Sequence, residues 1–136
     1  MHLHIINGPN LNLLGTRNPE QYGTMSFEDF LDSLNYEDIK ITYFQSNIEG
    51  EIINELHTSK ANGIILNAGG YTHTSVAIRD AVEAITIPVV EVHISNITKR
   101  ERFRHESLIS PVAIGCIFGF GIKGYQLAIE YFQRHL

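Results

Sequence analysis

Short apolar runs alternate with helical patterns along this chain, and this alternation limits the available folds more than any other feature. Strand character is found in five runs: residues 3–7, 39–45, 63–68, 88–94 and 112–119. Apolar residues at helical spacing are found in four segments: residues 26–34, 52–56, 75–85 and 124–132. The last three strand runs are nearly unbroken Ile, Val, Leu and Ala, which is typical of parallel strands covered on both faces. The sequence therefore predicts an α/β protein with a single doubly wound, five-stranded parallel sheet of the flavodoxin-like kind, in one domain over residues 1–136.

Bulk composition narrows the possible partners. The chain is 43% hydrophobic and carries a formal net charge of -5, which argues against broad binding to nucleic-acid phosphates. No stretch reaches the length of a membrane span, and the start, MHLHIING, lacks the features of a signal peptide. The single cysteine, Cys116, lies in an apolar setting and is expected to be buried. We therefore expect a cytoplasmic protein without a nucleic-acid or membrane partner.

Polar side chains collect where the predicted strands end, which is where open α/β sheets bind ligands. These residues include Asn7, Asn10, Gln45, Asn67, His73 and Ser95. Each of them alone could serve only a turn, and Thr72 could be only an N-cap. No acidic cluster accompanies them, so the pattern favours a polyhydroxylated ligand over a metal ion.

Glu91 and His93 are two residues apart on a predicted strand, so their side chains point to the same face. A buried glutamate beside a histidine can fix its tautomer and favour its charged form. The alternative is a histidine that only satisfies the core. The position of the pair, at the ligand-binding end of the strand, favours a functional role.

The run KRERFRHE is locally basic in an acidic protein, and a short charged helix is expected over residues 98–107. On such a helix Arg100 and Arg104 share a face, while Arg102 points elsewhere. This face is either only solvated, or it supplies a guanidinium group to an anionic ligand.

Two further patterns have ordinary explanations. The stretch GFGIKG fits G-x-G-x-x-G, but a dinucleotide site also needs a following strand and an acidic residue about twenty positions on. Close packing of helix on sheet explains these glycines. His2 and His4 could chelate a metal from one strand face, yet no carboxylate or cysteine accompanies them in sequence. We therefore predict neither a cofactor nor a metal.

The long loop GPNLNLLGTRNPEQYG, residues 8–23, carries an arginine and a tyrosine five residues apart. Loops of this length are usually functional or disordered. Together with five other stretches, this loop makes the chain resemble the type II 3-dehydroquinate dehydratases. The matching stretches are NGPNLNLLGTRNPEQYG, FQSNIEGEII, ILNAGGYTHTSVAIRDA, EVHISN, RERFRHES and GFGIKGYQLAI, in order over nearly the whole chain.

The resemblance implies an anti elimination of water from 3-dehydroquinate, through an enolate intermediate, to give 3-dehydroshikimate in the shikimate pathway. It implies no metal and no organic cofactor. It also implies a homododecamer built as a tetramer of trimers, and a mobile lid over about residues 15–24. Arg102 stands where the family pattern has a glutamate, and the segment between residues 23 and 45 is shorter than in the family.

The resemblance assigns a catalytic role to five residues. Tyr22 would remove the proton beside the ketone, and Arg17 would favour the phenolate form of this tyrosine, whose ordinary pKa is about 10. His93 would be the general acid that protonates the departing hydroxyl group, and Glu91 would hold it charged or correctly oriented. Asn10 would help to stabilise the enolate.

Six further residues match the family's substrate-binding set: Asn67, His73, Asp80, Ile94, Ser95 and Arg104. Ile94 and Ser95 would act through their backbone. Asp80 would reach the site of a neighbouring subunit, which makes the oligomer part of the site.

Other functions remain open on the residues alone. A flavin- or nucleotide-binding flavodoxin-like module would need a hydroxyl-rich loop after the first strand, and residues 7–14 contain no Ser or Thr. A phosphoacceptor domain would need aspartates where Asn7 and Asn67 stand. An imine mechanism would need a lysine at the carboxyl end of an apolar strand, and none is found there. An inactive homologue is the last alternative.

Overall fold

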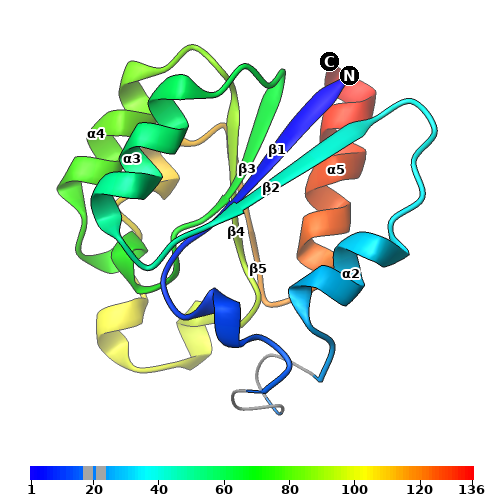
Figure 1. Ribbon diagram of the computed structural model, residues 1–136. Helices are drawn as coiled ribbons and strands as arrows, with labels where there is room; N and C mark the ends of the chain where they lie inside the picture. The colour runs from blue at the N-terminus through cyan, green and yellow to red at the C-terminus, as the bar shows by residue number, and fades with distance from the viewer. Residues whose placement is uncertain (17–19, 21–23) are drawn as a thin grey trace.

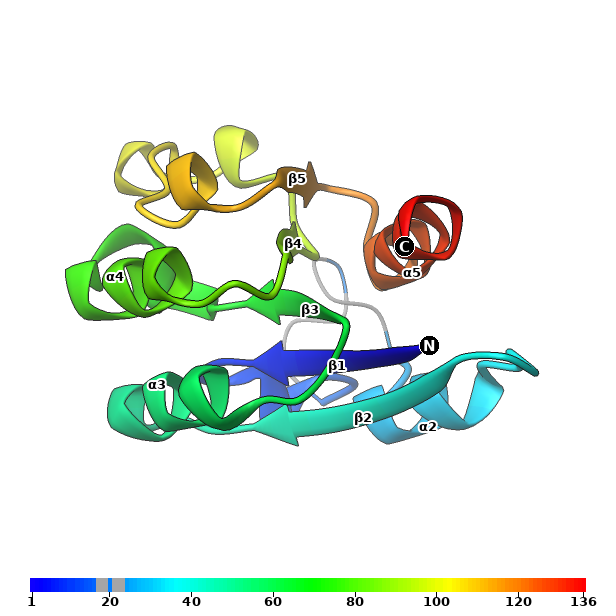
Figure 2. The same cartoon turned by 90° about the horizontal axis from the view of Figure 1, so that it is seen from above.

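The structure is a computed structural model that describes residues 1–16, 20 and 24–136. Five parallel strands form one sheet in the order β2-β1-β3-β4-β5, which Figure 2 shows from above. The strands are β1 (His2–Asn7), β2 (Lys40–Gln45), β3 (Gly63–Asn67), β4 (Val89–His93) and β5 (Gly115–Phe118). The predicted doubly wound, flavodoxin-like sheet is confirmed.

Helices cover both faces of the sheet. The helices are α2 (Phe27–Ser33), α3 (Glu49–Thr58), α4 (Val76–Ala84) and α5 (Lys123–His135). Helices α2 and α5 lie on one face, and α3 and α4 lie on the other (Figures 1 and 2). Side-chain caps begin two of them, since Ser26 accepts from the backbone of Asp29 and Ser75 accepts from that of Ile78. None of the described helices is both long and apolar enough to cross a membrane.

The core is divided into two apolar clusters, one on each side of the sheet. Helix α5 contributes Tyr125, Ala128, Ile129 and Phe132, whose spacing puts them on one helix face. Strands β3 and β4 are buried along their whole length, as their unbroken apolar runs predict. The sheet is therefore a rigid platform for the loops at its carboxyl end.

Strand β5 differs from the prediction. It begins only at Gly115, because Ser110–Val112 forms the 3-10 turn η5 with Pro111 in its first turn. The strand is at the edge of the sheet and is not fully covered, so the expectation of two covered faces is wrong for it. Cys116 is exposed for the same reason, and the prediction that it is buried is also wrong.

The charged helix expected over residues 98–107 is also a wrong prediction. The segment instead forms two 3-10 turns, η3 (Ile97–Lys99) and η4 (Arg102–Arg104). Its run of charged residues offers no apolar stripe that could pack against the sheet along a continuous helix. Two short turns carry the arginines across the carboxyl end of the sheet.

The loops that follow β1 and β3 touch each other. The backbone N–H of Gly8 donates to the carbonyl oxygen of Asn67 at 2.7 Å. A Cβ atom at Gly8 would come within 2.6 Å of the carbonyl oxygen of Ala68, so only glycine fits this position. This contact brings the 3-10 turns η1 (Leu11–Leu13) and η2 (Gly69–His73) to the same edge of the sheet.

Candidate active site

A cavity of about 170 Å³ opens at the carboxyl end of the sheet. Among the residues that line it are Asn10, Asn67, His73, His93, Ile94 and Ser95. Arg100 and Arg104 also line it. The structure therefore brings together most of the side chains that the sequence predicts for the site.

Two of the predicted positions that the structure describes, Asp80 and Glu91, are not among the residues that line this cavity. Arg17 and Tyr22 lie outside the described residues, as does most of the predicted lid over about residues 15–24. Asp80 is exposed on α4 and pairs with Arg79, whose Nη1 lies 3.5 Å from Oδ1 of Asp80. Glu91 is buried behind His93.

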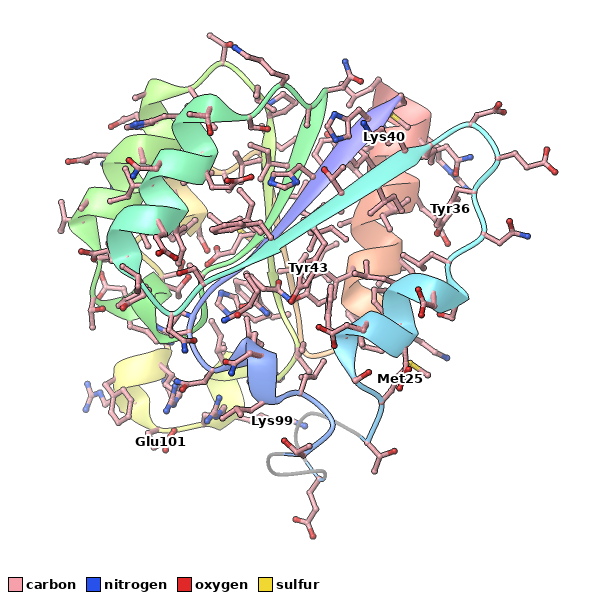
Figure 3. The ribbon with its side chains drawn as sticks, in the orientation of Figure 1. Met25, Tyr36, Lys40, Tyr43, Lys99 and Glu101 are labelled. Carbon is pink, nitrogen blue, oxygen red and sulfur yellow. The ribbon has the colours of Figure 1, made fainter. Side chains whose placement is uncertain are left out.

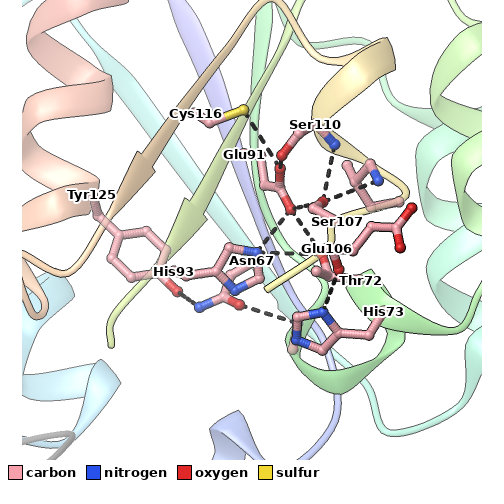
Figure 4. A network of polar contacts seen from close by, with 12 residues as sticks. Asn67, Thr72, His73, Glu91, His93, Glu106, Ser107, Ser110, Cys116 and Tyr125 are labelled. Atoms are coloured by element: carbon pink, nitrogen blue, oxygen red, sulfur yellow. Dashed lines mark hydrogen bonds and ion pairs between the residues drawn. The ribbon is translucent and has the colours of Figure 1, made fainter. Parts of the chain in front are cut away.

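His93 lines the cavity at the end of β4, and Glu91 lies behind it on the same strand (Figure 4). Oε1 of Glu91 lies 2.8 Å from Nε2 of His93, and the two residues are 0% and 5% exposed. An ionised carboxylate only accepts hydrogen bonds, so Nε2 of His93 carries a hydrogen. Nδ1 is then the ring nitrogen that can exchange a proton with a molecule in the cavity.

Three hydroxyl groups also contact the Glu91 carboxylate. Thr72 and Ser107 donate to Oε1 at 2.8 and 2.7 Å, and Ser110 donates to Oε2. Burial raises the pKa of Glu91, but the hydrogen bonds from His93, Ser107 and Ser110 and the charge of His93 outweigh it and lower the pKa to about 2. Glu91 is therefore a carboxylate at any pH near neutrality.

Sequence reasoning missed this hydroxyl cluster. Thr72 is not the N-cap of α4, because Ser75 takes that position. Ser107 and Ser110 are 16 and 19 residues from Glu91, so no local spacing relates them to it. The only available signal was the apolar strand that places Glu91 in the core, where a carboxylate needs donors.

The side chain of Asn67 is oriented by a hydrogen bond to a buried tyrosine. Its Nδ2 donates to the hydroxyl group of Tyr125 at 2.9 Å, and its Oδ1 accepts from the backbone of Gly69 at 3.1 Å. Tyr125 in turn donates to Oδ1 of Asn7 at 2.8 Å. The amide of Asn67 retains one N–H and one lone pair for a ligand, in a fixed orientation.

Two arginines also line the cavity. Nη1 of Arg100 donates to Oγ of Ser95 at 3.3 Å, and Nε of Arg104 donates to Glu101 at 2.7 Å. Figure 3 shows Glu101 on the segment below the sheet that carries these arginines. Two guanidinium groups at one cavity suit an anionic ligand.

His73 and Asn10 are also oriented by their neighbours. Nδ1 of His73 donates to the carbonyl oxygen of Glu106 at 2.7 Å, so in the neutral ring Nε2 is the acceptor. Asn10 has a left-handed backbone with a φ of 69°, and its N–H donates to Oδ1 of Asn47 at 3.0 Å. Asparagine tolerates this backbone better than most residues.

The two other sequence patterns have structural contacts of their own. A Cβ atom at Gly124 would lie 3.3 Å from Val92, so the last glycine of GFGIKG allows α5 to pack closely on the sheet. Nε2 of His2 and Nδ1 of His4 both bond Oγ1 of Thr42 at 2.7 Å. The described part of the chain contains no group of three or more His, Cys, Asp or Glu side chains that could hold a metal.

The fold and the site define a class of protein: a flavodoxin-like α/β protein with a buried histidine–carboxylate pair under a cationic cavity. The family model for dehydroquinase class II matches residues 1–133. This chain belongs to the class II dehydroquinase family.

Individual relatives agree with the family match. A protein from Exiguobacterium named 3-dehydroquinate dehydratase is 52% identical over 139 residues, which cover 99% of this chain and 96% of the relative. One of the same name from Fusobacterium nucleatum is 54% identical over 140 residues and covers 96% of this chain and 95% of the relative. The type II dehydroquinase structure from Butyrivibrio crossotus superposes with a TM-score of 0.93 at 42% identity, covering 98% of this chain and 97% of the other.

Proposed function

We propose that this chain is a 3-dehydroquinate dehydratase of type II, which converts 3-dehydroquinate to 3-dehydroshikimate and water in the shikimate pathway. The observation that carries the proposal is the buried Glu91–His93 pair beneath a cavity with two arginines. A proton donor and two guanidinium groups at one cavity suit the loss of a hydroxyl group from an anionic, polyhydroxylated ring. The family match and the names of the relatives support the same reaction.

The elimination needs a base and an acid. Tyr22, as the phenolate, takes the proton beside the ketone, and the electron pair moves into an enolate that Asn10 helps to stabilise. Arg17 favours the phenolate. His93 then gives a proton from Nδ1 to the departing hydroxyl group, so that water leaves and the enone forms. Glu91 keeps Nε2 of His93 occupied during this step.

The described residues that line the cavity favour a base that comes from outside this set. The residues that line it there include no carboxylate, tyrosine or lysine. Burial raises the pKa of Tyr125, and burial raises that of Tyr43 to about 12, so neither is a phenolate near neutral pH. Tyr22 is the candidate that the resemblance supplies, and the acceptor Nε2 of His73 is the competitor within the described wall.

The substrate-binding role falls to the remaining wall residues. Arg104 is proposed to pair with the substrate carboxylate or its ring hydroxyl groups, together with Asn67, His73 and the backbone of Ile94 and Ser95. Asp80 is proposed to act in the site of a neighbouring subunit of a homododecamer, a tetramer of trimers. Its exposure on α4, away from the cavity of its own chain, agrees with such a role.

The chain is proposed to act as one domain with a lid. One catalytic domain spans residues 1–136, a lid covers about residues 15–24, and the reaction takes place in the cytoplasm without a metal or an organic cofactor. An imine mechanism is disfavoured because no lysine is among the described residues that line the cavity. Lys40, for example, lies at the start of β2, at the other end of the sheet (Figure 3).

The test is to mix the purified protein with 3-dehydroquinate and to follow the ultraviolet absorbance of the enone. We expect a rise in absorbance, unchanged by prior treatment with borohydride and substrate. No rise from a folded protein of dodecameric size would contradict the proposal. A yellow protein without dehydratase activity would favour the flavin-binding alternative instead.

A further inference from the structure

The carboxylate of Glu91 is surrounded by hydrogen-bond donors from four segments of the chain. Besides His93, its contacts are Thr72 of η2, Ser107 in the loop after η4, and Ser110 of η5 (Figure 4). The sulfur of Cys116 lies 3.6 Å from Oε2. A buried carboxylate is stable only when such donors replace its lost hydration.

The contacts of the Ser107 oxygen fix the direction of its hydroxyl hydrogen. Its oxygen accepts from the backbone N–H groups of Ile109 at 3.1 Å and Ser110 at 3.0 Å. With both lone pairs occupied, the hydroxyl hydrogen is left to point at Oε1 of Glu91, 2.7 Å away. The loop is thus folded around its own serine so that this group donates to the carboxylate.

Thr72 contacts both members of the pair. Its Oγ1 lies 2.8 Å from Oε1 of Glu91 and 3.3 Å from Nε2 of His93. The residue is fully buried, and its carbonyl oxygen accepts from the N–H of Leu108 at 2.8 Å. This contact ties η2 to the loop that carries Ser107.

We propose that Thr72, Ser107 and Ser110 are positioning residues of this site: their hydroxyl groups hold the Glu91 carboxylate in one orientation, and the carboxylate in turn fixes the ring of His93. The three form a hydroxyl cage. The part of the proposal that concerns catalysis rests on the proposed role of His93 as the general acid.

The cage acts through geometry and charge. Donors on both oxygens prevent the carboxylate from turning, so Oε1 stays opposite Nε2 of His93 and Nδ1 stays toward the cavity. The hydrogen bonds from Ser107 and Ser110, with that from His93, also oppose the effect of burial and lower the pKa of Glu91, so the carboxylate stays charged. A cage without its hydroxyl groups would leave a buried carboxylate short of donors, and such a group takes up a proton more readily.

The first experiment compares two substitutions at one buried position. Thr72→Val keeps the shape of the side chain and removes the hydroxyl group, whereas Thr72→Ser keeps the hydroxyl group and removes a methyl. Ser107→Ala and Ser110→Ala test the other two donors. Ser33→Ala is the matched control, because its hydroxyl donates to the carbonyl of Phe30 on α2, away from the cavity.

Two readouts separate positioning from a merely structural effect. One is the carboxyl carbon NMR signal of Glu91 as a function of pH, and the other is kcat and KM for 3-dehydroquinate. We expect the Glu91 titration to move up by about one pH unit or more in Thr72→Val, Ser107→Ala and Ser110→Ala. We expect kcat to fall about tenfold or more with KM little changed, because each variant loses a hydrogen bond to a charged group.

The outcomes are distinct. Wild-type kcat and Glu91 titration in Thr72→Ser, together with the losses in Thr72→Val, would support the cage. Equal effects of the two Thr72 substitutions, or a Glu91 titration that no variant moves, would overturn it; Ser110→Ala alone decides the matter if Thr72→Val does not fold. A wild type without dehydratase activity whose Glu91 titration still shifts in the variants would support the cage and contradict the proposed function.

Discussion

Nε2 of His93 lies 2.8 Å from Oε1 of Glu91, with both side chains buried at the end of β4. The contact follows directly from strand geometry, because side chains two residues apart share a face. The groups that hold the carboxylate, in contrast, come from loops distant in sequence. The spacing of the strand therefore predicts the pair, but the donors that stabilise it come together only in the folded chain. The effect of Glu91 on stability can be measured separately from catalysis.

Glu91 makes the stability of the protein depend on pH in the acid range. Its pKa is lowered from 4.5 to about 2, so its charge stabilises the fold above about pH 4.5 and loses this effect as the pH falls toward 2. The contribution is on the order of 3 kcal/mol. We expect Glu91→Gln to lower the free energy of unfolding at pH 7, and this difference to shrink between about pH 4.5 and pH 2. Urea unfolding at a series of pH values measures it; a difference that is constant with pH would contradict the assignment.

Tyr22→Phe tests the proposed base. The substitution removes only the phenol hydroxyl, so we expect kcat to fall by orders of magnitude while substrate still binds. Tyr43→Phe is the matched control, since Tyr43 stacks on Phe27 with ring centroids 4.7 Å apart and lies on the α2 and α5 side of the sheet (Figure 3). Normal turnover in Tyr22→Phe, with loss in His73→Gln, would move the role of the base to His73.

Arg17→Ala tests whether a guanidinium group tunes that base. Removing a positive charge near a phenol raises the pKa of the phenol, so the rise of activity with pH should move to higher pH and turnover near neutrality should fall. The profile of kcat against pH measures this shift. Arg134→Ala, at the exposed end of α5, is the charge-matched control. A profile that does not move would remove Arg17 from this role.

Arg104→Ala tests the anion-binding wall. Arg104 lines the cavity, whereas Arg102, two residues earlier on the same turn, does not line it in the described structure. Loss of a charge-assisted hydrogen bond should raise KM about tenfold or more in Arg104→Ala. Arg102→Ala should leave KM near the wild-type value. Equal KM values for the two variants would show that the general basic character of the segment, not Arg104, attracts the substrate.

Mixing subunits tests the proposed role of Asp80. If Asp80 completes the site of a neighbour in a trimer, inactive Asp80→Ala and inactive His93→Ala subunits should regain activity when refolded together. Random mixing predicts activity at about a quarter of the sites. The control mixture of Arg104→Ala with His93→Ala should show no activity beyond that of its Arg104→Ala subunits, because Arg104 and His93 line the cavity of the same chain. Recovery in neither mixture would place Asp80 outside the site.

Particular elements show how far the sequence could predict the structure. The apolar runs of β3 and β4 identified two central strands, because burial on both faces leaves a continuous apolar pattern. The same logic was wrong for β5, whose apolar residues lie at the sheet edge and leave Cys116 exposed. The prediction of a helix in the basic run after β4 was wrong, because charge alone does not decide between a helix and two turns.

Local sequence patterns were enough to predict the α/β alternation, the Glu91–His93 pair and the gathering of polar residues at the carboxyl ends of the strands. Each of these depends on local periodicity, which is visible along the chain. Three other features became visible only in the packed fold: Ser107 and Ser110 bond Glu91, Tyr125 bonds Asn67, and Arg100 and Arg104 line one cavity. These contacts join residues far apart in sequence, and packing of the sheet, not local spacing, brings them together.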